Sequence, residues 1–150
     1  MNITNKMEIE FTAKSENESF ARMSVIGFIA YLNPTMEALE DIKIAISEAV
    51  TNAIIHGYQE ENTNENLVKI RCYVTQGDEA LVYIEVEDTG VGIENIVQSI
   101  EPMYSSALDD NRAGMGFSFM EAFMDGLEIE SQVGVGTTIS LCKKIKEYGK

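Results

Sequence analysis

Apolar and polar residues alternate along most of this chain, and the period changes between two and about 3.6 residues. A period of two is typical of a half-buried strand, and the longer period of an amphipathic helix. Strands are predicted over residues 7–13, 68–74, 82–86, 128–131 and 137–143. Helices are predicted from Ser15 to about Leu32, from Thr35 to about His56, and from Gly114 to Met124.

Local signals define the ends of these helices. Ser15 and Glu18 match a capping box, Ser-x-x-Glu, at the start of the first helix. Thr35 can cap the second helix, and Gly57 is a typical C-terminal stop. Helical spacing predicts two buried stripes. The first comprises Phe20, Met23, Ile26 and Ala30, and the second Leu39, Ile42, Ile46, Ala49, Val50, Ala53 and Ile54.

The order of elements predicts an α+β two-layer sandwich, in which a mixed, mostly antiparallel sheet is covered by helices on one face. The turn at 76–79 favours a hairpin between the second and third strands. Residues 93–112 lack clear periodicity and predict a short helix followed by a long loop. Such a long loop inside a compact domain is typical of a functional lid or of a disordered segment. We therefore predict one domain over residues 1–150 with a lid at about 99–113.

Charge and cysteine content limit the classes of function. Eleven basic residues against 25 acidic ones give a net charge of −14, which disfavours binding to nucleic acid or to anionic lipid. Cys72 and Cys142 form no Cys-x-x-Cys motif, so we expect buried free thiols in a reducing cytoplasm. The chain has no signal-like start and no apolar run long enough to span a membrane.

A line of polar residues borders the apolar stripe of the second helix. Glu48, Asn52 and His56 follow at i, i+4 and i+8, so in an α-helix they share one face. One interpretation is a polar seam whose hydrogen bonds are satisfied within the fold. The other is the wall of a site, in which Glu48 acts as a general base and the amide oxygen of Asn52 binds a hard cation such as Mg²⁺.

Glycine-containing turns supply further candidates. Asp88 ends a strand and is followed by Gly90 and Gly92, which let the backbone come close to a flat ligand. The carboxylate of Asp88 could then accept a hydrogen bond from an exocyclic amine of that ligand. Alone, this pattern is also an ordinary turn. Gly114 and Gly116 precede a helix, whose free N–H groups suit phosphate oxygens, and Arg112 is the nearby cation.

These motifs follow one another in a characteristic order: Glu48-x3-Asn52-x3-His56, Asp88-x-Gly90-x-Gly92, Gly114-x-Gly116 and Gly136-Thr137-Thr138. The order resembles the ATP-binding domain shared by gyrase, Hsp90, histidine kinases and MutL mismatch-repair proteins, over about residues 7–143. Stretches 17–22, 33–36, 47–58 and 114–117 look more narrowly like the anti-sigma F factor family of spore-forming bacteria, whose members are serine-protein kinases. The resemblance implies a Bergerat-type ATP-binding fold.

The resemblance also implies a function. A family member binds and inhibits the sporulation sigma F factor, phosphorylates a serine of an anti-anti-sigma factor with Mg-ATP, and forms a homodimer. The implied roles are general base for Glu48, Mg²⁺ ligand for Asn52, adenine recognition for Asp88 with Gly90 and Gly92, water-mediated adenine support for Thr138, phosphate binding for Gly114 and Gly116, and lid contacts for Ser105, Ser106 and Arg112. One departure lies in the lid, where Ala107 follows the two serines in place of the family's lysine.

Other functions stay open at this point. An anti-sigma B-type stress-response kinase shares the motifs and the chemistry but has a different partner. A non-catalytic module that binds a sigma factor and retains ATP needs Asn52, Asp88 and the glycines, but not Glu48. A histidine autokinase or a gyrase-type ATPase would need additional domains, for which 150 residues leave no room. Arg22 is either a solvated side chain or a contact for an acidic partner.

Overall fold

The computed structural model describes residues 2–59, 65–94 and 116–146. Its strands are β1 (Ile3–Thr12), β2 (Leu67–Gln76), β3 (Ala80–Asp88), β4 (Gly126–Gln132) and β5 (Gly136–Ile145). Its α-helices are α1 (Glu18–Ile29), α2 (Met36–Asn52) and α4 (Gly116–Phe123). Short turns, η1 (Ser15–Asn17) and η2 (Ala30–Leu32), flank α1, and a π-helical turn, η3 (Ala53–Gly57), continues α2.

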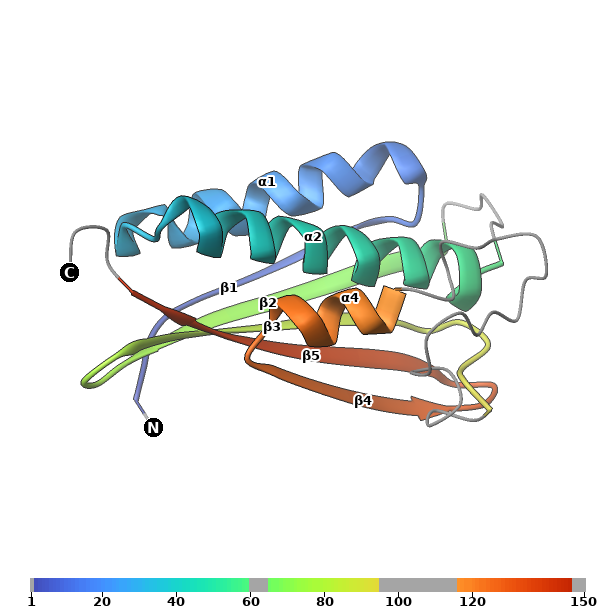
Figure 1. Cartoon of the computed structure of the whole chain (residues 1–150). Helices are drawn as coiled ribbons and strands as arrows, with labels where there is room; N and C mark the ends of the chain where they lie inside the picture. The colour runs from blue at the N-terminus through green and yellow to red at the C-terminus, as the bar shows by residue number, and fades with distance from the viewer. Residues whose placement is uncertain (1, 60–64, 95–115, 147–150) are drawn as a thin grey trace.

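The five strands form one sheet in the order β1-β2-β3-β5-β4 (Figure 1). Every strand pairing in the described part of the chain is antiparallel, including the predicted β2–β3 hairpin. We predicted a mixed, mostly antiparallel sheet, and the parallel part of that prediction is wrong for the described strands. β3 and β4 do run parallel to each other, but β5 lies between them and pairs antiparallel with both.

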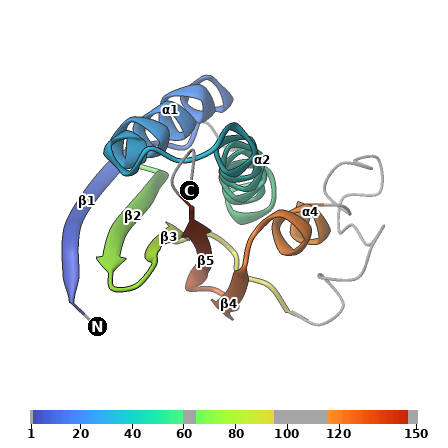
Figure 2. The ribbon, with the colours of Figure 1, turned by 60° about the vertical axis from the view of Figure 1, so that its left-hand side comes forward.

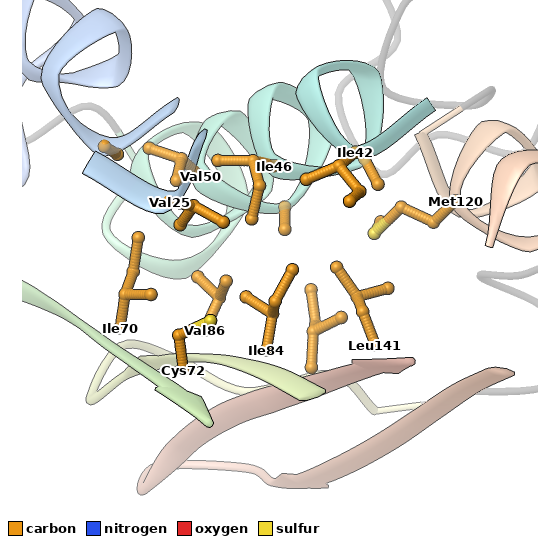
Figure 3. Packing of buried hydrophobic residues seen from close by; sticks show 14 of the residues in the cluster. Val25, Ile42, Ile46, Val50, Ile70, Cys72, Ile84, Val86, Met120 and Leu141 are labelled. Carbon is orange, nitrogen blue, oxygen red and sulfur yellow. The ribbon is translucent and has the colours of Figure 1, made fainter. Parts of the chain in front are cut away.

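All three α-helices lie on the same face of the sheet (Figure 2), which confirms the predicted two-layer α+β sandwich. The core fills the space between the layers. Residues from α1 and α2 face residues from β2, β3 and β5 across it, and Met120 of α4 closes one side (Figure 3). The buried stripe of α2 contains all the predicted positions except Leu39, which is partly buried and packs against the core.

The face that α1 buries differs from the predicted one. Ala21, Val25 and Ile29 are fully buried, whereas Phe20 and Met23 are 53% and 58% exposed. Apolar residues lie on two sides of this helix, so periodicity alone did not show which stripe faces the sheet. Two further large apolar residues beyond α1 are exposed, Tyr31 in η2 and Met36 at the start of α2. We call these four exposed residues the outward stripe.

The predicted capping box at Ser15 and Glu18 is also wrong. Ser15 begins η1, and α1 starts after Asn17, whose side chain donates to the carbonyl oxygen of Thr12 at 2.9 Å. The carboxylate of Glu18 instead accepts a hydrogen bond from the hydroxyl of Ser47 on α2. A tertiary contact between the two helices has therefore replaced the local cap. The predicted cap of α2 is confirmed, because Thr35 Oγ1 accepts from the backbone N–H of Ala38 at 3.1 Å.

The sheet face without helices, called the open face here, is largely polar. Arg71 on β2 lies 3.4 Å from a carboxylate oxygen of Glu85 and 3.2 Å from one of Glu87, both on β3. The rings of Tyr73 and Tyr83 stack beside them, with centroids 4.9 Å apart. The open face therefore suits water, while the site residues described next lie on the helical side or at the end of the sheet.

The two cysteines occupy opposite faces. Cys72 is fully buried on the helical face, and burial raises the pKa of its thiol to about 12. Cys142 pairs with Tyr83 in the register and is half-buried on the open face. Both are free thiols, although only Cys72 is as buried as predicted. No helix among the described residues is long and apolar enough to span a membrane.

Candidate functional site

Asp88 is a carboxylate buried at the end of a strand. It is the last residue of β3 and is only 5% exposed. The backbone N–H of Gly90 donates to its Oδ1 at 2.9 Å, and the backbone of Thr137 on β5 provides a second hydrogen bond. Burial raises the pKa of Asp88 to about 6, although these two hydrogen bonds counteract part of the rise. At pH 7 the group is an ionised acceptor in a largely dry setting.

Glycines allow backbone segments to pack tightly around this carboxylate. A Cβ on Gly90 would lie 2.0 Å from the carbonyl oxygen of Gly57, and one on Gly57 would lie 2.8 Å from Cγ of Asp88. Gly92 has a φ of +80°, which favours glycine, and a Cβ there would lie 2.4 Å from the carbonyl oxygen of Gln132. We predicted that Gly90 and Gly92 let the backbone come close to a flat ligand. In the structure their immediate requirement is close contact between backbone segments.

Two backbone hydrogen bonds and two of the Tyr58 hydroxyl hold these segments together. The backbone N–H of Val91 donates to the carbonyl oxygen of Gly57 at 2.8 Å, and that of Gly134 donates to Val91 at 2.8 Å. The Tyr58 hydroxyl accepts from the backbone N–H of Thr89 at 2.7 Å and lies 2.7 Å from the Leu67 carbonyl oxygen, to which it donates. The turn after Asp88 is therefore fastened to the end of the long helix on one side and to the β4–β5 turn on the other.

The register of β5 places Thr137, rather than Thr138, beside Asp88. Thr137 pairs with Asp88 and is 4% exposed, whereas Thr138 pairs with Glu87 and lies on the open face. Because successive side chains of a strand point to opposite faces, this one-residue difference moves the hydroxyl to the other side of the sheet. Thr138 was predicted to support the adenine contact through water, and the register places it one position from Asp88, on the opposite face of the sheet from Thr137.

A short hydroxyl network surrounds Thr137. Its Oγ1 lies 2.8 Å from Oγ of Ser131 on β4, and Ser131 Oγ accepts from the backbone N–H of Ile93 at 2.7 Å. Sequence reasoning missed Thr137 and Ser131. The signal for Thr137 was present in the alternation itself, because Ile139 and Leu141 face the core and Thr137 shares their parity.

The other predicted site residues lie on α2 and at the start of α4. Glu48 and Asn52 are both half-buried, and Asn52 is the last residue of α2. A Cβ on Gly116, the first residue of α4, would lie 3.4 Å from Oε2 of Glu48. The fold therefore brings the carboxylate of Glu48 and the first residue of α4 together, as the predicted roles require.

The predicted line of Glu48, Asn52 and His56 is interrupted at its end. Residues Ala53–Gly57 form a π-helical turn, in which the backbone N–H of Tyr58 bonds to the carbonyl oxygen of Ala53 at 2.9 Å. The α-helical spacing rule therefore does not hold for His56. π-turns inside α-helices often occur at functional sites, and this one brings Gly57 against Asp88.

Several predicted site residues lie outside the described part of the chain: Ser105, Ser106, Arg112 and Gly114, together with the predicted lid at 99–113. Arg22 lies within it. Its side chain is 35% exposed, and Nη1 lies 3.9 Å from Oε1 of Glu18 on the same helix, so it is a partly covered cation with an acidic neighbour.

Comparisons with known proteins show the family to which this chain belongs. Residues 11–143 match the model of the histidine kinase-like ATPase domain family. An anti-sigma F factor from Clostridium beijerinckii is 51% identical over 93% of this chain and 94% of its own length. One from Clostridium acetobutylicum is 52% identical over 95% of each chain. The chain belongs to the anti-sigma F factor family.

A solved structure supports the same fold for this anti-sigma F family member. The structure of the RsbU and RsbW domains of a Mycobacterium tuberculosis protein superposes with a TM-score of 0.62 and 20% identity. It covers 96% of this chain, which spans 33% of that longer chain. The match extends over nearly the whole histidine-kinase-like ATPase fold, and membership of the ATPase family makes this chain an ATP-using domain.

The buried carboxylate predicts a pH-dependent difference between the wild type and Asp88→Asn. The pKa of Asp88 is raised when folded, so the ionised carboxylate destabilises the fold as pH rises from about 4 to about 6. Asp88→Asn removes this penalty. The free energy of unfolding of the variant minus that of the wild type should therefore increase over that pH range and stay increased at pH 7. Urea unfolding at a series of pH values measures this, and a constant difference would contradict it.

The same variant should bind ATP more weakly. A hydrogen bond to a charged acceptor contributes about 1.5–3 kcal/mol, so Asp88→Asn should raise the Kd for ATP by about tenfold or more at pH 7. Wild-type affinity should also fall below pH 6, as the carboxylate becomes protonated. Calorimetric titration checks both, and unchanged affinity in a folded Asp88→Asn variant would contradict the role of Asp88.

The strand register makes Thr137→Ala and Thr138→Ala a matched pair. Removing the hydroxyl beside Asp88 should raise the Kd for ATP about three- to tenfold, which corresponds to one neutral hydrogen bond. Removing the hydroxyl on the open face should change it less than twofold. Thermal unfolding of both variants controls for stability, and a larger effect of Thr138→Ala would reverse the assignment.

Proposed function

We propose that this chain is an anti-sigma factor and protein-serine kinase. In this proposal it binds the sporulation sigma F factor and phosphorylates a serine of an anti-anti-sigma factor with Mg-ATP. Family membership supports the proposal, as does one arrangement in particular. The buried acceptor Asp88 lies at the end of β3 against Gly57. The carboxylate of Glu48 lies farther back along α2, beside the first turn of α4.

The nucleotide would lie along the C-terminal end of α2. Gly57 contacts Asp88, and Glu48 is nine positions earlier along the same continuous α2–η3 segment. Adenine would be bound at Asp88 through its amino group, with the hydroxyl of Thr137 nearby. The phosphates would lie toward Gly116, whose backbone N–H begins α4. In a protein of net charge −14, such local groups must attract the polyanion.

Asn52 is the residue that would hold Mg²⁺. Among the described residues, no three or more His, Cys, Asp or Glu come together as a metal cage. Mg²⁺ does not need one, because it keeps several waters and binds one or two protein oxygens together with substrate phosphates. The half-buried amide of Asn52, one helical turn after Glu48, fits that requirement. When bound, the ion would neutralise charge on the transferred phosphoryl group.

Glu48 would act as the catalytic base. Its carboxylate would accept the proton of the serine hydroxyl as the serine Oγ–P bond forms. The bond from the γ-phosphorus to the bridging oxygen breaks at the same time, and ADP leaves with that electron pair. Phosphoryl transfer depends mainly on positioning and charge stabilisation, so the geometry around Glu48 carries most of the chemistry.

The partners and the lid belong to the proposal as well. Arg22 would contact an acidic partner from the exposed side of α1, and the family name supports sigma F as the bound factor. Ser105, Ser106, Arg112 and Gly114 would contact the phosphates from the lid. An anti-sigma B-type partner and a non-catalytic ATP-retaining module are the alternatives, and co-purification with one sigma factor and the transfer assay below distinguish them.

A homodimer is proposed on the outward stripe of α1. Phe20 and Met23 on α1, Tyr31 in η2 and Met36 at the start of α2 are each at least 53% exposed. Large apolar residues that are exposed as one patch mark an interaction surface. Between Ser19 and Met36 the only charged residue is Arg22. Two copies that each carry −14 repel one another least where their contact surfaces lack acidic groups.

Substitution of the base tests the kinase assignment. Glu48→Gln should leave the Kd for ATP nearly unchanged, while serine phosphorylation falls by about two orders of magnitude or more, the scale of general-base loss. The assay uses labelled ATP and the anti-anti-sigma factor from the same genome. Glu40→Gln, which removes an exposed carboxylate on the same helix, is the matched control and should keep wild-type activity.

Different outcomes eliminate different parts of the proposal. Wild-type transfer by Glu48→Gln would end the role of Glu48. A wild-type chain that binds ATP and sigma factor but never labels the partner would be the non-catalytic module.

The outward stripe predicts a change of assembly state. Met23→Glu places a carboxylate in the stripe and should convert a dimer to a monomer in sedimentation experiments, with the fold unchanged by circular dichroism. Lys6→Glu, which adds the same negative side chain on the exposed part of β1, should remain dimeric. A wild-type chain that sediments as a monomer would contradict the homodimer.

A further inference from the structure

Tyr58 is a buried polar residue that directly follows the π-helical turn. It is 6% exposed, and its hydroxyl oxygen lies 2.7 Å from the carbonyl oxygen of Leu67, at the start of β2. The same oxygen lies 2.7 Å from the backbone nitrogen of Thr89 and 3.1 Å from the Thr89 hydroxyl. A phenol has one proton, which goes to Leu67, so the oxygen accepts from Thr89. The hydrogen-bonding capacity of the Tyr58 hydroxyl is therefore used within the protein.

The three backbone N–H groups that follow Asp88 all donate to acceptors that fix the turn. These hydrogen bonds run from Thr89 to the Tyr58 hydroxyl at 2.7 Å, from Gly90 to Oδ1 of Asp88 at 2.9 Å, and from Val91 to the carbonyl oxygen of Gly57 at 2.8 Å. Two of the three acceptors belong to adjacent residues of one segment, Gly57 and Tyr58. Gly90 is therefore held on both sides, through its two neighbours in the chain.

This arrangement fixes the direction of the Asp88 carboxylate. The N–H of Gly90 lies in the peptide plane that Gly90 shares with Thr89, because a peptide bond is planar. Tyr58 holds the N–H of Thr89 and so limits the rotation of this plane, and the plane in turn holds Oδ1 of Asp88. A buried carboxylate held in this way keeps its remaining acceptor positions in one direction before a ligand arrives.

A carboxylate with a fixed direction can discriminate between ligands. A site built to hydrogen-bond an N–H group rejects an analogue without that group, because the buried acceptor is then left unpaired. A carboxylate that is free to turn can reach water instead, and the penalty against the analogue is lost. Selectivity therefore depends on the groups that hold Asp88 as well as on Asp88 itself.

We propose that Tyr58 is a positioning residue for nucleotide selection, which acts through Thr89 and Gly90 to hold the Asp88 carboxylate toward the amino group of adenine. The inference rests on the proposed role of Asp88 in adenine binding. It deepens that role, because it names the group that sets the selectivity for 6-aminopurine nucleotides. The Tyr58 hydroxyl acts on the protein and not on the nucleotide.

Tyr58→Phe removes the hydroxyl and keeps the buried ring. The test ligands are ATP and purine riboside triphosphate, which has hydrogen in place of the 6-amino group. The wild type should bind ATP about tenfold more tightly or better, the scale of one hydrogen bond to a charged acceptor. In Tyr58→Phe the Kd for ATP should rise about three- to tenfold and that for the analogue should stay within about twofold, so the preference for ATP falls. Calorimetric titration measures both.

Tyr73→Phe is the matched control. It removes a hydroxyl from the open face, where the rings of Tyr73 and Tyr83 stack, and should leave both Kd values within about twofold of the wild type. If Tyr58→Phe loses the same factor of affinity for both nucleotides, or none for ATP, the positioning role is overturned. A wild type that binds both nucleotides equally would instead refute the role of Asp88 in adenine binding, and this inference with it. The kinase assignment is tested separately, by phosphate transfer.

Amide hydrogen exchange tests the positioning directly, without nucleotide and in the wild type as well. The amides of Gly90 and Val91 should exchange slowly in the wild type and about tenfold or more faster in Tyr58→Phe, while amides in the centre of β3 exchange alike in both. NMR spectroscopy resolves the individual amides. Rapid exchange at Gly90 and Val91 in the wild type would overturn the inference without any variant, as would equal rates in the two proteins.

Discussion

The contact between the end of the long helix and the turn after β3 is the constraint on which the site depends. Gly57 and Gly90 approach so closely that neither position has room for a side chain, and Asp88 is enclosed between them. This contact ties the α2–η3 segment, which carries Glu48 and Asn52, to the end of β3 at Asp88. The enclosure also desolvates Asp88 and raises its pKa to about 6, a cost in stability that is offset elsewhere by the large apolar core.

The distribution of charge follows from the same architecture. The open face of the sheet carries cross-strand ion pairs such as those of Arg71, which contribute little to stability but keep that face in water. On the helical side, the proposed nucleotide site has few cations among the described residues, and it relies on backbone N–H groups and a proposed metal ion. A strongly acidic chain can in this way bind an anion locally while its surface repels polyanions in general.

Helix α1 has two apolar faces with different tasks. Ala21, Val25 and Ile29 anchor it to the core, and the outward stripe leaves surface for assembly. Glu18 and Arg22, in its first two turns, line a pocket between α1 and α2 together with Glu48. One short helix therefore carries both the proposed dimer surface and the proposed partner contact.

The sequence alone was sufficient for the element order, the α+β class, the α2 core stripe and the cap at Thr35, because these depend on local spacing and on short-range hydrogen bonds. The motifs also indicated the family, because the residues of each motif and the order of the motifs along the chain can be compared directly from the sequence. Only the tertiary structure decided the buried face of α1, the use of Glu18 as an interhelical acceptor, and the π-turn at Ala53–Gly57. It likewise placed Thr137 rather than Thr138 beside Asp88. Each of these depends on which distant segment packs against the residue, and a helix with two apolar stripes or a strand with two adjacent threonines is compatible with either choice until the partner element is in place.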